Sequence, residues 1–191
     1  MPRAGLSRAA VVELATQLVD ELPGGPEALT LAAVAQRAGV ATPSLYKHIG
    51  SLDALRAEVA LVGAIDIRDR LRAATVGVAG VDALRALAEA LRSYAREHPG
   101  LYLALQRAAG PQDPELVRVG GEVVDVIAAV LRGFGLPPER AVDAVRTTRA
   151  ALHGFVLLEN GGGFGLPDDV DRSFAALVDV LATGITALRE E

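Results

Sequence analysis

The chain has 191 residues, 51% of them hydrophobic and only 4% aromatic, with a formal net charge of −5. The absence of cysteine excludes disulfides and thiolate metal sites. The longest uncharged stretches, such as 150–158, run about nine residues, whereas a membrane-spanning helix needs about 20 apolar residues. We therefore expect no membrane segment. The N-terminus shows no signal-peptide core, so the cytoplasm is the simplest expected location.

Every strong hydrophobic pattern has the helical period, which predicts an all-α fold of about nine helices. The first helix is expected over about 7–22 and ends at a Pro-Gly-Gly-Pro turn. The second begins after the N-cap Thr30 and ends at Gly39, and the third covers 42–49 with Pro43 in its first turn. The fourth helix spans 52 to about 74, and its apolar side is expected to carry Leu55, Val59, Val62 and Ile65.

Five further helices are expected in the rest of the chain. They cover about 81–98, 101–109, 113–134, 136–160 and 168–188. The seventh opens on Asp113-Pro114-Glu115, which combines an N-cap, a first-turn proline and an acid that suits the helix dipole. A glycine-rich loop at 161–165 separates the last two; it lacks the preceding strand and the lysine of a phosphate loop.

The charge distribution singles out one segment. No acidic residue occurs from 28 to 52, while Arg37 and Lys47 supply positive charge there, to which His48 adds only when it is protonated. Lys47 is the only lysine of the chain, although one residue can fall in this window by chance. The remainder is acidic, which would confine contact with a polyanion to one face.

The same segment has the spacing of a helix-turn-helix. Apolar positions that are expected to face inward are Leu31, Val34, Ala35, Val40, Leu45 and Ile49. The small residues Ala35 and Gly39 are expected to let the two short helices cross closely. Side chains left facing outward on the third helix are Thr42, Pro43, Ser44, Tyr46, Lys47 and His48. This polar, acid-free surface suits the DNA major groove, although Tyr46 as a buried core residue is the alternative.

The run from Thr30 through Gly39-Val40 and Leu45-Tyr46 to Ile49 and Leu55 resembles the TetR (tetracycline-repressor) family. The segment 151–155 and the glycine loop resemble a ligand-sensing C-terminal domain of that family. The resemblance implies that Thr42, Pro43 and Ser44 reach base edges, that Tyr46 and His48 grip phosphates, and that Lys47 does either. It also implies that Thr30 binds phosphate at a helix N-terminus. Leu52 departs from the family, which usually has lysine there, and this departure removes one phosphate contact.

The resemblance implies a DNA-binding domain at 1–51 and an effector-binding and dimerisation domain at 52–191. We expect a homodimer in which two apolar stripes on the last two helices form a four-helix interface. The stripes are Leu152, Phe155, Val156 and Glu159 on one helix and Phe174, Leu177, Val178 and Leu181 on the other. The alternative is that both stripes face the subunit's own core.

Polar groups among apolar ones in the middle helices suggest a site for a small apolar or aromatic effector. The candidates are Tyr94, His98, Tyr102, Gln106, Arg107 and His153, each of which is equally well interpreted as a core polar group. The three histidines of the chain lack metal-ligand spacing, and the sequence predicts no catalytic residue, metal or cofactor.

The leading hypothesis is therefore a repressor that a ligand releases from a palindromic operator. Two alternatives stay open at this point. One is a helical-bundle enzyme or carrier with an incidental N-terminal resemblance, and the other is a constitutive DNA-binding protein without an effector.

Overall fold

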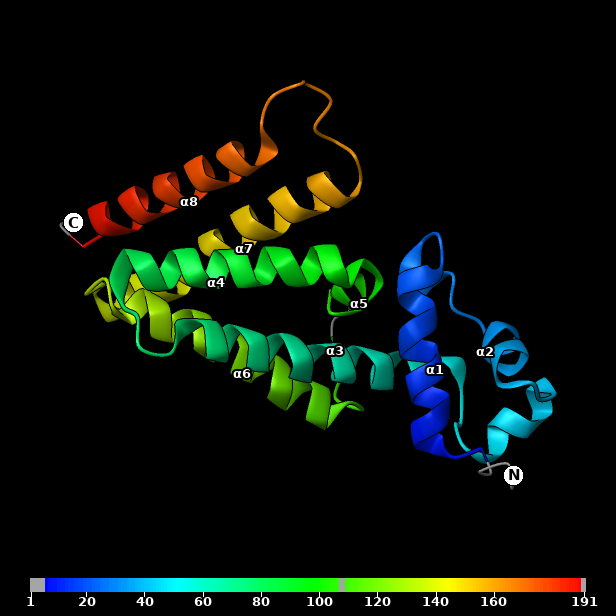
Figure 1. Ribbon diagram of the computed structural model, residues 1–191. Coiled ribbons are helices and arrows are strands. Elements are labelled where there is room, and N and C mark those ends of the chain that lie inside the picture. Colours follow the sequence, from blue (N-terminus) through cyan, green and yellow to red (C-terminus); the bar gives the residue numbers. More distant parts are fainter. Residues whose placement is uncertain (1–5, 107–108, 190–191) are drawn as a thin grey trace. The chain divides into compact units, whose positions relative to one another are not determined.

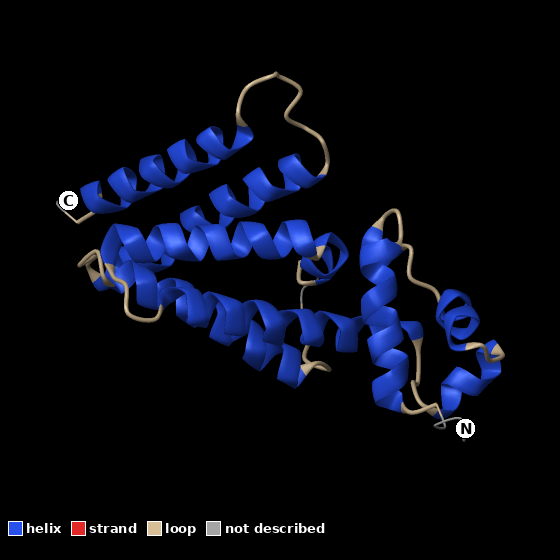
Figure 2. Ribbon diagram, in the orientation of Figure 1, coloured by secondary structure: helices blue, strands red, loops and turns tan. Residues whose placement is uncertain are grey.

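The computed structural model describes residues 6–106 and 109–189, and every regular element in these ranges is a helix (Figures 1 and 2). In chain order the elements are α1 (Arg8–Glu21), η1 (Gly25–Glu27), α2 (Leu31–Ala38), η2 (Thr42–Lys47), α3 (Leu52–Thr75), α4 (Gly80–Glu97), α5 (Pro99–Ala104), α6 (Pro114–Arg132), α7 (Pro138–Asn160) and α8 (Val170–Ala187). The all-α prediction is confirmed. The nine predicted helices correspond to the eight α-helices and η2 of the described residues, and the short 3₁₀ segment η1 is additional.

The chain forms two compact units. The first holds the described residues up to Asp66 together with His98–Val119, and the second holds Ile67–Glu97 and the described residues from Gly120 onward. The α5 segment thus belongs by its contacts to the unit that contains α1 and α2. The functional boundary expected after residue 51 remains a prediction. Within the described residues no helix is long and apolar enough to cross a membrane.

The first unit is built around a small tri-helical core. The side chains that fill it include Val11, Ala15, Leu18 and Val19 of α1, Leu31, Val34 and Ala35 of α2, and Leu45, Ile49 and Leu55 further on. All predicted inward positions are buried except Val40, which is half-buried. Burial of each such leucine contributes roughly 1.5–3 kcal/mol relative to exposure, so this core fixes how α2 and η2 are presented.

The apolar side of α3 differs from the prediction. Leu55 and Val59 are buried, but Val62 and Ile65 are 38% and 37% exposed. The buried row instead follows Ala60, Ala64, Ile67 and Leu71. A helix turns about 100° per residue, so Val62 lies within about 20° of Leu55 around the helix axis, whereas Ala64, Ile67 and Leu71 lie about 120–180° from it. The buried face therefore moves around α3 along its length, and a single apolar side could not describe it.

The second unit packs α4 against both α7 and α8, which also contact each other (Figure 1). A charged side chain lies inside it: the Arg92 side chain is only 4% exposed. Its Nε and Nη2 atoms donate to Glu159 at 2.8 and 2.6 Å, and Nη2 donates to Asp171 at 2.7 Å. The guanidinium lies 4.6 Å from the centre of the Phe174 ring. One arginine of α4 therefore ties α7 to the start of α8.

Candidate DNA interface

The third predicted helix is a 3₁₀ helix, not the α-helix expected from the sequence. Its hydrogen bonds join Ser44 N to Ala41 O and His48 N to Leu45 O, both at 2.8 Å. The segment begins without a side-chain cap at Ala41, and Pro43 has no N–H to donate. With three residues per turn, side chains three positions apart lie one above the other.

This geometry sorts the η2 side chains into three rows. The inward row holds the fully buried Leu45 flanked by the half-buried Thr42 and His48. One outward row holds Pro43 and Tyr46, and the other holds Ser44 and Lys47. The Tyr46 side chain is 58% exposed, so the alternative of a buried core tyrosine is wrong.

Two helix N-termini adjoin this surface in the sequence. The exposed Thr30 caps α2, its Oγ1 accepting a hydrogen bond from Ala33 N at 3.1 Å, as predicted. Ser51 does the same for α3, its Oγ accepting from Ala54 N at 3.0 Å. The interpretation of the sequence missed Ser51, although a serine directly before an apolar-periodic run is a standard start signal. Both ends carry partial positive charge suited to phosphate.

The turn between α2 and η2 is set by Gly39. Its φ of 67° lies in the left-handed region, which glycine adopts without strain. An added Cβ at Gly39 would meet no atom within 4 Å. The expectation that Gly39 is small to let the helices cross closely is therefore wrong, and the residue is needed for the backbone turn.

Arg37 contributes less positive charge to this surface than its position in the acid-free window suggests. Its guanidinium is paired with the Glu21 carboxylate, with Nη1 and Oε1 3.2 Å apart. Hydrogen bonding to Arg37 holds the pKa of Glu21 below its usual value. Lys47, exposed on η2, therefore supplies the positive charge of the outward rows.

The residues predicted for an effector site occupy both units. Tyr94 is fully buried in the second unit with the Arg70 guanidinium 5.0 Å from its ring centre, and His153 is half-buried there. Burial, followed by the charge of Arg149, lowers the pKa of His153, which favours the neutral form of the imidazole.

In the first unit, Tyr102 is buried, and the exposed Gln106 donates through Nε2 to the Tyr102 carbonyl at 3.2 Å. His98 Nδ1 lies 3.0 Å from Asp20 Oδ2. Arg107 lies outside the described residues. The involvement of these six side chains in ligand binding remains a prediction.

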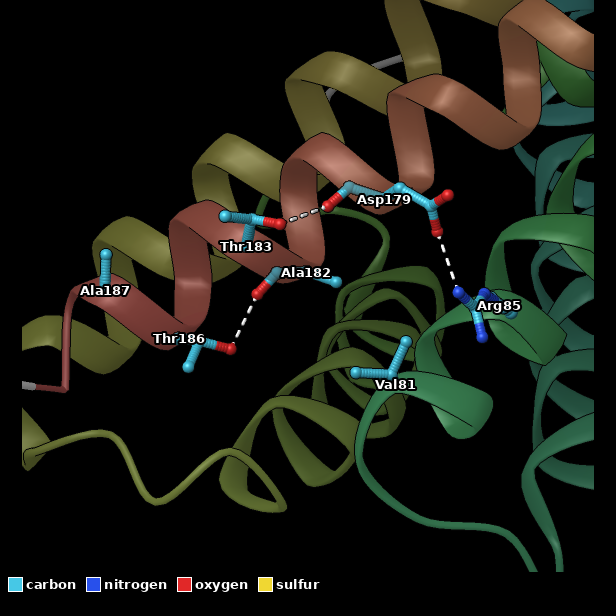
Figure 3. A pocket seen from close by; sticks show the side chains of 7 residues that line it. All are labelled: Val81, Arg85, Asp179, Ala182, Thr183, Thr186 and Ala187. Atoms are coloured by element: carbon cyan, nitrogen blue, oxygen red, sulfur yellow. Dashed lines mark hydrogen bonds and ion pairs between the residues drawn. The ribbon is translucent and has the colours of Figure 1, made fainter.

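Two pockets lie along α4 and α8 in the second unit. One, of about 540 Å³, is lined by α4 and α8 and crossed by an ion pair between Arg85 and Asp179 at 2.9 Å (Figure 3). The other, of about 400 Å³, includes Arg92, Asp171 and Phe174. The linings of these two pockets, drawn from the described residues, include none of the predicted effector residues.

The stripes predicted for dimerisation lie mainly inside the second unit. Leu152, Val156, Phe174, Val178 and Leu181 are buried within the single chain, and Phe155, Leu177 and Glu159 are half-buried. The Phe155 ring contacts the Phe164 and Phe174 rings with centroids 4.8 and 5.1 Å apart. Glu159 is engaged by Arg92. In the single chain these side chains therefore pack the contact of α7 with α8 and α4.

Comparison with known proteins gives a family match for an N-terminal and a C-terminal segment of the chain. Residues 23–59 match the family profile "Bacterial regulatory proteins, tetR family", and residues 84–181 match "Tetracyclin repressor-like, C-terminal domain". The uncharacterized HTH-type transcriptional regulator Rv0681 of Mycobacterium tuberculosis is 40% identical over 185 residues, covering 95% of this chain and 83% of the relative. The uncharacterized HTH-type regulator YobS of Bacillus subtilis is 30% identical, covering 96% and 95%.

Solved structures share the fold. The TetR regulator SCO7222 of Streptomyces coelicolor superposes with a TM-score of 0.72 at 21% identity, covering 96% of this chain and 99% of its own. A single-residue variant of TetR from Acinetobacter baumannii AYE, in complex with minocycline, gives 0.70 at 23% identity, covering 96% and 98%. The two family profiles and the 40% identical relative together show that the chain belongs to the TetR family of DNA-binding transcriptional regulators.

Proposed function

We propose that this protein is a homodimeric repressor that a small apolar or aromatic ligand releases from a palindromic operator. The observation that carries the proposal is the pair of outward rows of η2. They carry no acidic residue. Pro43, Tyr46 and Lys47 in them are exposed and Ser44 is half-buried, and both rows rest on the buried Leu45 and Ile49 of a packed helix-turn-helix core. Such a surface is what a major groove with its donor and acceptor pattern requires.

Within the predicted DNA-binding set, the rows assign different roles. Pro43 and Ser44, at the start of the outward rows, are proposed to contact base edges, while Tyr46 and Lys47 contact phosphates or the next base. Thr42 and His48 lie in the half-buried row, so we expect smaller effects from their substitution. Thr30 is proposed to hold a phosphate at the start of α2, where its hydroxyl hydrogen stays available because Oγ1 accepts the capping bond.

The homodimer is proposed to form through faces of α7 and α8 other than the buried stripes. On α8 the exposed residues Ala176, Val180, Gly184 and Ala187 follow one another at helical spacing and carry no charge. On α7 the corresponding row is Thr147, Ala150, Gly154 and Leu158, of which only Gly154 is half-buried. An added Cβ at Gly154 or Gly184 would meet open space. Small uncharged rows on two adjacent helices suit close packing against a second copy about a two-fold axis.

The effector is proposed to be apolar or aromatic and to contact Tyr94, Tyr102 or Gln106. The family neighbour in complex with minocycline supports a ligand-responsive role. Effector and operator must then weaken each other's binding by the same factor. If every compound that binds has the same affinity with and without saturating operator, the protein is a constitutive DNA-binding protein instead. The prediction that the chain has no enzymatic activity remains untested.

The test is selection of bound DNA from a random double-stranded pool. We expect enrichment of a palindrome with half-sites about one DNA turn (~34–36 Å) or a multiple of it apart, because dimer symmetry is mirrored in the operator. The matched control is the Ser44→Ala, Lys47→Ala double variant, which keeps the buried Leu45. Equal enrichment by the control, or no enrichment by the wild type, would contradict the proposal.

A further inference from the structure

Helix α5 is fastened to the end of α1 by one carboxylate. Asp20, near the C-terminus of α1, accepts a hydrogen bond on Oδ1 from Leu101 N at 2.9 Å. Its Oδ2 lies 3.0 Å from His98 Nδ1. His98 is the N-cap residue of α5 and makes no side-chain cap bond, and Pro99 has no N–H. The cap that α5 lacks in its own sequence is therefore supplied by a residue 81 positions earlier.

The backbones of the two helices also meet directly. A Cβ placed on Gly100 would lie 1.9 Å from the Val19 carbonyl oxygen, so glycine alone permits this approach. The buried Gly25 of η1, with φ of +58°, faces α5 as well, since its added Cβ would lie 3.3 Å from Leu103 Cδ1. Helix α5 thus packs on both sides of the corner where α1 ends.

That corner leads directly to the DNA-binding surface. The chain runs from η1 through 28–29 to Thr30, the cap of α2. Arg56 of α3 holds the same linker by donating from Nη2 to the carbonyls of Glu27 and Leu29 at 3.1 and 3.4 Å. The contacts of α5 with α1 and η1 and the hydrogen bonds of Arg56 therefore act on one stretch of chain, which ends at the cap of α2.

We propose that Asp20 is a positioning residue for operator binding, which fastens α5 to α1 and so holds the helix-turn-helix in the orientation that binds DNA. The inference rests on the proposed function. If loss of the Asp20 contacts leaves the DNA-binding orientation populated about a tenth of the time, operator affinity falls about tenfold.

The test uses the sign of the effect. Removing an acid should by electrostatics alone strengthen binding to DNA. Asp20→Ala is expected instead to weaken operator binding about tenfold, whereas the charge-matched Glu13→Ala, at an exposed position of α1, binds at least as tightly as wild type. Asp20→Asn keeps an oxygen acceptor for Leu101 N–H and should bind with intermediate affinity. His98→Ala, which leaves that bond intact, serves if Asp20→Ala does not fold, and is expected to weaken binding by a smaller factor.

Amide hydrogen exchange without DNA measures the fastening by itself. The Leu101 amide should exchange faster in Asp20→Ala than in Glu13→Ala. Unchanged Leu101 exchange overturns the capping, and faster exchange with wild-type or tighter operator binding overturns the positioning role. If Asp20→Ala does not fold, operator binding by His98→Ala equal to that of wild type overturns it. Failure of the wild type to select any operator contradicts the proposed function instead, and the exchange comparison still decides the capping.

Discussion

Replacement of Arg92 by methionine should be among the most destabilising single changes in the second unit. The substitution keeps the aliphatic length but leaves Glu159, whose side chain is 16% exposed, without its cation. Breaking a buried pair costs about 3–5 kcal/mol. We expect the lower end, about 3 kcal/mol, because Asp171 is 76% exposed and regains water. For a chain of this length that corresponds to a fall of about 6–12 °C in Tm.

Thermal unfolding of wild type and variants at one protein concentration measures this, since association changes apparent stability. The control is Arg96→Met, one turn further along α4, where the guanidinium is 56% exposed and lies 3.9 Å from Asp171. That change should stay within about 0.5 kcal/mol. The Arg92→Met, Glu159→Met double variant should recover most of the loss. A loss in Arg92→Met no larger than in Arg96→Met would refute this account.

The same pair predicts a dependence on pH. The hydrogen bond from Arg92 holds the folded-state pKa of Glu159 below its ordinary value. The carboxylate's contribution is therefore fully present above the unfolded pKa of about 4.3, and it is lost as the pH falls through the lower folded-state value. The stability difference between wild type and Glu159→Gln should shrink over that acid range, and a difference that stays constant would contradict the assignment.

Lys47→Ala should weaken operator binding and lower the salt slope by about one, whereas Arg146→Ala, exposed on α7, should leave both unchanged. Equal slopes for the two variants would remove Lys47 from the interface. Leu52→Lys should tighten binding and raise the slope by about one, because it restores the usual family cation beside the capped start of α3; unchanged binding would place Leu52 away from phosphate. Val180→Glu, at a 70% exposed position of α8, should give monomers by light scattering, while Val76→Glu, which is 78% exposed outside the rows, should remain dimeric. A folded, fully dimeric Val180→Glu would exclude this interface.

The elements predicted well were those with chemical end signals. Thr30, Gly39 and Pro114 mark boundaries through capping and backbone geometry that depend on neighbours in sequence. The 3₁₀ form of η2 was not predictable in this way, because a six-residue segment carries too little periodicity to separate three from 3.6 residues per turn.

Contacts between residues far apart in the chain could not be predicted from the sequence, for a different reason. Periodicity showed that Leu152 and Phe174 face something apolar, but not whether that surface belongs to the same chain or to a second copy. The contact of Asp20 with α5 joins residues about 80 positions apart and has no local signal. The ion pair of Glu159 with Arg92 also joins residues far apart in the sequence and has no local signal. The sequence pattern alone assigns Glu159 to the dimer interface.

The exposed Lys47 is a single position at which a lysine side chain of this protein can be modified chemically. Since no other lysine occurs in the chain, its side chain is the single ε-amine that an acylating reagent can meet. One acetyl or fluorophore group there would remove the positive charge of the outward rows of η2. A molecule acylated at its one lysine would thus carry its reporter on the surface where DNA is proposed to bind, with no residue engineered into it.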